Sequence, residues 1–165
     1  MSLNARLVFM TISLSFAVYP GAVIRAAAPT DACVLLTPAQ VGAALGVTVG
    51  AGQRVTPTNA LVCGWAQPTD TSHTGKRVVL SIYSQLGSRT PADRFATAKT
   101  PIQGVEKTPV AGVGDDAFYA TTPGLGTVLI FKKGESAFDL RVYGFPIDEI
   151  KAKEKTLAAD LIGKL

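Results

Sequence analysis

The chain has 165 residues, enough for one domain and too few for two ordinary ones. Hydrophobic residues make up 47% and charged residues 17%, which excludes a disordered or low-complexity protein. The formal charge is +4, and one histidine with two cysteines offers too few ligands for a usual zinc or iron site. We therefore expect no metal and no cofactor.

Residues 1–28 have the features of a secretory signal peptide. Arg6 supplies a positive start, residues 7–18 are uncharged and mostly apolar, and residues 26–28 are three alanines. The apolar run is short for a membrane span, and an uncleaved anchor is the alternative. Cleavage after Ala26 or Ala28 is expected. Removal of residues 1–28 leaves one exported domain over residues 29–165, with a formal charge of +2 and a periplasmic or secreted location.

The charge pattern also bears on partners. The mature charge is nearly balanced and no run of Lys or Arg exceeds two residues, so we expect no nucleic-acid partner. We also expect no stable membrane span in the mature form, and a monomer. Three lysines alternate near the C-terminus with two glutamates, which predicts a solvated helix face, with weak attraction to anionic surfaces as the alternative: Lys151, Lys153, Lys155, Glu149 and Glu154.

Two cysteines in an exported chain favour a disulfide. Cys33 and Cys63 are the only pair, so their connectivity follows if they bond. Attachment of a lipid to Cys33 is the alternative. The preceding residues 30–32, Thr-Asp-Ala, argue against it because a lipoprotein signal has an aliphatic residue three positions before the cysteine.

Two helices have the same start signal. Thr37 is followed by Pro, Ala and Gln, and Thr90 by Pro, Ala and Asp, which predicts helices over about 37–46 and 90–99. The two signals lie 53 residues apart. This faint echo has two interpretations, a duplicated half-domain or two similar helix caps, and the sequence alone favours the second.

Alternating apolar residues predict several strands and a closing helix. Val78, Leu80 and Ile82 share one side of a strand, and residues 127–132 are apolar on both sides, as in a central strand. The result is an α+β fold: a mostly antiparallel sheet of five to seven strands, with two short helices and a longer C-terminal helix packed on one face. The expected segments are strands within 47–59 and over 60–67, 77–84, 116–121, 127–132 and 137–143, and a helix over 146–164.

The outward side chains of two of these strands form the candidate binding surface. Tyrosine and arginine are frequent in binding hot spots. Plain exposed sheet positions are the alternative, and the sequence does not show whether the two strands are neighbours. The candidate residues are Ser81, Tyr83, Asp139, Arg141 and Tyr143.

No motif predicts a catalytic residue. Residues 112–117 fit G-x-G-x-x-A, but an extended segment follows where a nucleotide site needs a helix, so a tight turn is expected. Asp115 and Asp116 are adjacent and should point to opposite sides of a strand, one of them capping the turn. His73 lies in a polar loop and no G-x-S-x-G is present, so a solvated loop histidine is expected.

Three motifs give the chain a family resemblance. Residues 31–46 (DACVLLTPAQVGAALG), residues 63–65 (CGW) and residues 112–118 (GVGDDAF) resemble small bacterial cell-envelope domains of unknown function, many of them actinobacterial lipoproteins. The resemblance spans most of the mature chain through short motifs only. It implies an exported α+β domain with a bond between Cys33 and Cys63, and it offers no catalytic residues. The chain lacks a lipobox, so the lipid anchor is not carried over.

These observations favour a non-enzymatic binding domain. The partner would be a protein or a small ligand of the cell envelope, held on the exposed sheet face. An inhibitor of a secreted enzyme is one alternative. A hydrolase is the other, and it would require a deep pocket that contains His73 or Asp115.

Overall fold

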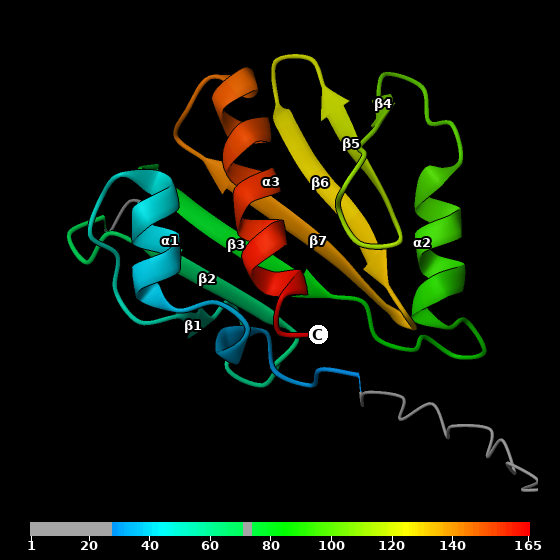
Figure 1. Cartoon of the computed structure of the whole chain (residues 1–165), viewed down its shortest axis with the longest axis horizontal. Coiled ribbons are helices and arrows are strands. Elements are labelled where there is room, and N and C mark those ends of the chain that lie inside the picture. The colour runs from blue at the N-terminus through cyan, green and yellow to red at the C-terminus, as the bar shows by residue number, and fades with distance from the viewer. Residues whose placement is uncertain (1–27, 71–73) are drawn as a thin grey trace, which may run out of the picture.

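The computed structural model describes residues 28–70 and 74–165 (Figure 1). Seven antiparallel strands form one sheet in the order β1-β2-β3-β7-β6-β5-β4. The α+β class and the antiparallel sheet are confirmed. The elements are the 3₁₀ turn η1 (Ala32–Val34), the helices α1 (Pro38–Leu45), α2 (Pro91–Lys99) and α3 (Ile147–Ile162), and the strands β1 (Gln53–Arg54), β2 (Val62–Ala66), β3 (Arg77–Ile82), β4 (Glu106–Pro109), β5 (Asp116–Thr122), β6 (Gly126–Lys133) and β7 (Ser136–Tyr143).

The two short helices begin at the predicted caps. Thr37 accepts a hydrogen bond from the backbone N–H of Gln40, and its own N–H donates to the Gln40 side chain. Thr90 and Asp93 form the same reciprocal pair at the start of α2. Each box satisfies two backbone N–H groups that would otherwise lack an acceptor at the start of the helix. A proline follows each cap because it fits the first helical position.

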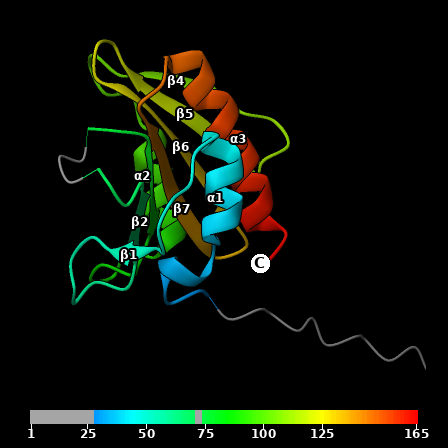
Figure 2. The same cartoon turned by 90° about the vertical axis from the view of Figure 1, so that its left-hand side faces the viewer.

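The helices do not all share one face of the sheet. Helices α1 and α3 lie together on one side (Figure 2) and pack on the larger core. Helix α2 packs on the other side, which corrects the expectation of a single helical face. The physical reason is Phe95, whose ring meets the ring of Phe118 edge-on at 5.6 Å and contacts a separate apolar cluster with Ile130 and Ala137.

The predicted strands are present, and β4 is an addition. Strand β6 lies between β5 and β7 and is covered on both faces, as its two apolar sides predict. Strand β4 pairs only with β5 at the sheet edge, and most of it is exposed. Its sequence, Glu-Lys-Thr-Pro, has no apolar alternation, so the pattern gave no signal.

The disulfide between Cys33 and Cys63 is confirmed, with a distance of 5.1 Å between the two Cα atoms. It joins the N-terminal turn to β2. Cys63 and Trp65 are fully buried beside each other on the α1 side of the sheet. A Cβ atom on Gly52 would lie 2.7 Å from the indole nitrogen of Trp65 and 2.8 Å from the sulfur of Cys63, so only glycine fits there.

The 53-residue echo extends beyond the two caps. The starts of α1 and α2 are 53 residues apart, those of β1 and β4 also 53, those of β2 and β5 54, and those of β3 and β6 49. Strands at equal distances from β7 are the equivalent ones. The structure therefore favours a repeated α-β-β-β unit, the interpretation that the sequence favoured less. Outside the caps, the repeat is one of topology more than of residue type.

Candidate functional site

The five candidate residues lie on one face of the sheet. Strands β3 and β7 are neighbours, with Ser81 opposite Asp139. Tyr83 extends β3 by donating its N–H to the carbonyl of Ala137, at 2.8 Å. Residues two positions apart in a strand share a face, so the set lies opposite the core that α1 and α3 cover. We call this surface the open face, formed by Val62, Gly64, Ala66, Arg77, Val79, Ser81, Tyr83, Asp139, Arg141 and Tyr143.

An ion pair occupies the middle of the open face. The Nε and Nη2 atoms of Arg141 donate to the two carboxylate oxygens of Asp139, each at 3.0 Å. Asp139 is on the outward side of β7 as predicted, but it is only 9% exposed, while the Arg141 side chain keeps 46% of its surface. The hydrogen bonds from Arg141 to Asp139 raise the pKa of the guanidinium further above its already high value. The pair thus presents a fixed, planar guanidinium to the outside.

An arginine lies against a tyrosine at each end of the open face. The Arg77 guanidinium is 4.0 Å from the centre of the Tyr143 ring, and that of Arg94 is 4.7 Å from the centre of the Tyr83 ring. Arg94 reaches over from α2 and also donates to the carbonyl of Ser84, at 2.8 Å. Burial raises the pKa of Tyr83, so its hydroxyl stays neutral at physiological pH. These contacts hold both rings in place, as binding anchors require.

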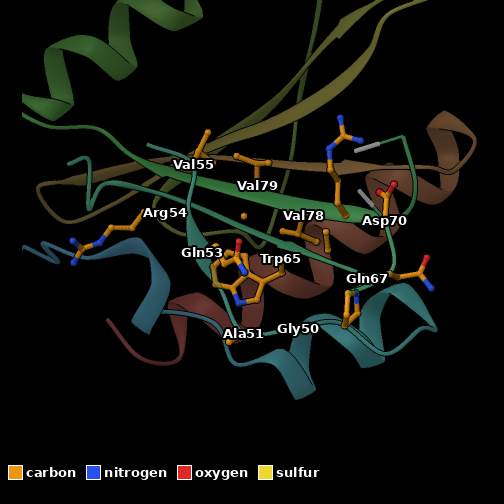
Figure 3. A pocket seen from close by; sticks show the side chains of 14 residues that line it. Gly50, Ala51, Gln53, Arg54, Val55, Trp65, Gln67, Asp70, Val78 and Val79 are labelled. Carbon is orange, nitrogen blue, oxygen red and sulfur yellow. The ribbon is translucent and has the colours of Figure 1, made fainter. Parts of the chain in front are cut away.

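A cavity of about 780 Å³ continues the open face toward the sheet edge. Its walls come from the segment around β1, from β2 and β3, and from the turn after β2 (Figure 3). Backbone hydrogen bonds from Gly50 to Ala66 and from Val55 to Val62 hold the outer wall against β2. The polar and charged side chains that line it are Gln53, Arg54, Gln67, Asp70 and Arg77.

The outer wall of the cavity is also fixed to the N-terminal segment. Arg54 forms an ion pair of 2.8 Å with Asp31, next to the disulfide. Val55 is 60% exposed beside this arginine. Val55 is on the same side of the strand as Gly64 on the open face, whereas Arg54 is turned the other way, toward Asp31.

Sequence reasoning missed part of this surface. Arg77 precedes Val79 and Ser81 on the same side of β3, so the alternation would have placed it there. Arg94 reaches the open face only because α2 packs on this side of the sheet, and no pattern in the sequence predicts that side. The cavity depends on how the segment before β2 folds back on the sheet edge, and it had no sequence signal either.

The other sequence candidates lie away from the open face. Asp115 accepts hydrogen bonds from the Gly134 N–H at 2.7 Å and from Lys133 at 3.0 Å, which lower its pKa. It therefore caps the turn between β6 and β7, and not its own turn at residues 112–117 as expected. Asp116 pairs instead with Lys99, at 2.8 Å. His73 lies outside the described residues. Among residues 28–70 and 74–165, no group of three or more His, Cys, Asp or Glu side chains could hold a metal ion.

One expectation for the C-terminal helix is wrong. Glu154, predicted on a solvated face, is fully buried and accepts a hydrogen bond from the Val142 N–H at 3.1 Å. Lys153 is also engaged, because it donates to the carbonyl of Ala44 at 3.0 Å and lies over the Phe145 ring. Of the three lysines, Lys155 remains exposed. No helix in the described ranges combines the length and the apolar character that a membrane span needs.

Comparison with known proteins adds nothing to this geometry. The chain matches no protein-family model, no curated protein and no solved structure.

Proposed function

We propose that the protein is an exported binding domain that holds a protein or a small ligand on the open face and performs no catalysis. One observation carries the proposal. The candidate residues, among them Tyr83, Arg141 and Tyr143, lie together on a sheet face that α1 and α3 leave uncovered, beside a cavity of about 780 Å³. Rigid aromatic and arginine side chains around a concavity are typical of a binding surface.

Export supports this function and rests on the leader-like residues 1–28. The disulfide between Cys33 and Cys63 is compatible with an oxidising location. An inhibitor of a secreted enzyme is the particular case in which the partner is an enzyme. The hydrolase alternative has less support, because Asp115 is engaged in a turn with Lys133 and does not line the cavity.

Site-specific photo-crosslinking tests the proposal. A benzophenone amino acid replaces Ser81 on the open face or, as a matched control, the exposed Thr156 on α3. The variants are exported in the native host and irradiated in intact cells. We expect a discrete crosslinked product from position 81 only. Products from position 156 alone, or equal products from both, would place the binding surface elsewhere and refute the proposal.

A further inference from the structure

The order of the sheet implies an internal two-fold axis. Equivalent strands flank β7 at equal distances, and because all neighbours are antiparallel, equivalent strands run in the same direction. A rotation that exchanges the two halves of a sheet and keeps the strand directions has its axis along the strands, here along β7. Such a rotation also exchanges the two faces of the sheet. Helices α1 and α2 obey it, since they pack on opposite faces.

Side chains of the core follow the same rotation. Trp65 on β2 points into the core beneath α1 and α3, whereas Phe118 on β5, 53 residues later, points to the cluster beneath α2. Their cross-strand partners Val78 and Ile130 separate in the same way. The axis therefore describes the packing of the two halves as well as their topology.

Helix α3 has no counterpart within the described residues. It packs on β6 and β7, beside α1. The rotation carries this position to β3 and β7 on the opposite face, beside α2. That place is the open face, where the candidate residues lie. Among residues 28–70 and 74–165, this helix position is thus filled on one face of the sheet and vacant on the other.

The open face suits a helix better than an extended peptide. Strand β3 is already paired with β2 and β7 on its two sides, so the backbone there offers no free edge to an added strand. The dimensions also match. A helix of 16 residues, the length of α3, is about 24 Å long, and a strand of eight residues, the length of β7, about 27 Å.

The charges of this surface define the side chains that would complement it. Three arginines and two aspartates line or flank it, an excess of one positive charge: Arg77, Arg94, Arg141, Asp70 and Asp139. Arg54 in the outer wall of the cavity is neutralised by its ion pair with Asp31. The apolar contribution comes from Val55, Val79 and the two tyrosine rings. A complementary helix therefore carries carboxylates next to an apolar stripe.

We propose that the open face receives an acidic, amphipathic α-helix of a partner protein, laid across β3 and β7 beside α2 in the position equivalent to that of α3. This inference rests on the proposed function and specifies its partner. Arg141 lies at the centre of the contact. The tyrosines at the two ends pack against the apolar stripe of the helix.

Selection from two peptide libraries tests this inference. Both libraries present 16-residue peptides on phage, one on a helix-stabilised scaffold and one with prolines that enforce an extended chain. The target is the exported protein with its disulfide formed. We expect binders from the helical library, rich in Asp and Glu beside an apolar stripe, and amide NMR shifts of the target confined to β2, β3, β7 and α2.

Two variants of the central ion pair give opposite expectations. Arg141→Gln removes the exposed positive charge and should weaken a selected acidic helix by at least about tenfold. Asp139→Asn frees the Arg141 guanidinium for the ligand and should strengthen binding. A general loss of structure would weaken binding in both variants, so the opposite signs separate recognition from unfolding. Lys155→Gln on α3 removes the same charge far from the open face and should leave binding unchanged.

The remaining outcomes contradict the inference at two levels. In the first case, the selected binders are extended or basic, or the target binds a second copy of itself, and Arg141→Gln or Tyr143→Ala still abolishes binding. The proposal of an acidic helix is then wrong, and the proposal that the open face is the binding surface stands. If no binder is selected, or if binding is unaffected by these substitutions and the NMR shifts lie elsewhere, both proposals fail.

Discussion

Glu154 on α3 accepts a hydrogen bond from the backbone N–H of Val142 on β7, at 3.1 Å, and is fully buried. The ladder between β6 and β7 ends at the pair Leu129 and Leu140, two residues before Val142. Glu154 therefore supplies an acceptor that the neighbouring strand does not. Val142 lies between Arg141 and Tyr143, so this buried carboxyl group supports the backbone of the open face from behind.

Burial of Glu154 should make stability depend on pH. Burial, with a smaller contribution from Asp139, raises the pKa of Glu154 to about 8, against the hydrogen bond from Val142 and the charges of Arg141 and Lys151. The folded state then holds a proton that the unfolded state has released. The contribution of Glu154 to stability is therefore fully present below about pH 4.5 and is lost as pH rises from there to about 8, by on the order of 1.4 kcal/mol per pH unit.

Substitution of Glu154 by Gln tests this dependence. Glu154→Gln keeps an acceptor for Val142 and removes the titration, so its free energy of unfolding should rise relative to that of the wild type between pH 6 and 9. Denaturant unfolding at each pH measures the difference between the two proteins. Both contain His73, so any effect of that residue is the same in each and drops out of the difference. Glu149→Gln, on an exposed position of the same helix, should follow the wild type. Parallel curves for wild type and Glu154→Gln would disprove the assignment.

Gly114 should be far less replaceable than Gly112. Both have positive φ angles, 56° and 76°. A Cβ atom on Gly114 would lie 2.2 Å from the Lys132 carbonyl oxygen, which accepts a hydrogen bond from the backbone N–H of Asp115. Nothing lies within 4 Å of a Cβ atom on Gly112. Gly114→Ala should therefore cost about 1–3 kcal/mol more stability than Gly112→Ala, measured by denaturant unfolding. Equal costs would mean that the backbone shifts freely at this turn.

The disulfide should contribute strongly to stability. It closes a loop with a sequence separation of 30 residues, for which the chain-entropy model gives about 3–4 kcal/mol. The double variant Cys33→Ala/Cys63→Ala should lose a comparable free energy of unfolding. Alkylation of the denatured, unreduced protein should add no mass, and alkylation after reduction should add two groups. Alkylation of the unreduced protein would show that the bond does not form.

The sequence predicted the parts of this fold whose side chains alternate. Val78, Leu80 and Ile82 define the buried side of β3, and their period of two also defines the side on which Ser81 lies. The same rule predicted the side of β7 on which Asp139 lies. It did not predict that Asp139 is buried, because burial depends on side-chain contacts such as the ion pair with Arg141. Periodicity gives the side of a strand, and it does not give the contacts made there.

What the sequence missed depends on tertiary packing. Phe95 marks the inner side of α2, yet nothing local indicates against which face of the sheet it packs. Glu154 is followed and preceded by lysines, where charge patterning predicts solvent, yet it is buried where α3 packs on the sheet and accepts a hydrogen bond from Val142 beyond the end of the ladder. Strand β4 has no apolar side and depends on β5 for its position. In each case the deciding interaction joins segments far apart in the chain.

The two capping boxes provide a last prediction, because they are alike in geometry and different in charge. Thr37→Ala and Thr90→Ala should each lower the free energy of unfolding, by about 1 kcal/mol near neutral pH. Their effects should add within about 0.5 kcal/mol, because α1 and α2 lie on opposite faces of the sheet without shared partners. Thr156→Ala, at an exposed site within α3, is the control and should cost less.

The two capping boxes should differ in how their contribution to stability depends on pH. The hydrogen bonds from Thr90 lower the pKa of Asp93, so this box stabilises the folded state above the ordinary aspartate pKa of 3.8 and loses that contribution as pH falls through the lowered value. The partner of Thr37 is Gln40, which does not titrate. The cost of Thr90→Ala should therefore shrink in acid while that of Thr37→Ala stays constant. Parallel pH dependence of the two costs, measured by denaturant unfolding from pH 2 to 7, would show that the Asp93 carboxylate does not stabilise α2.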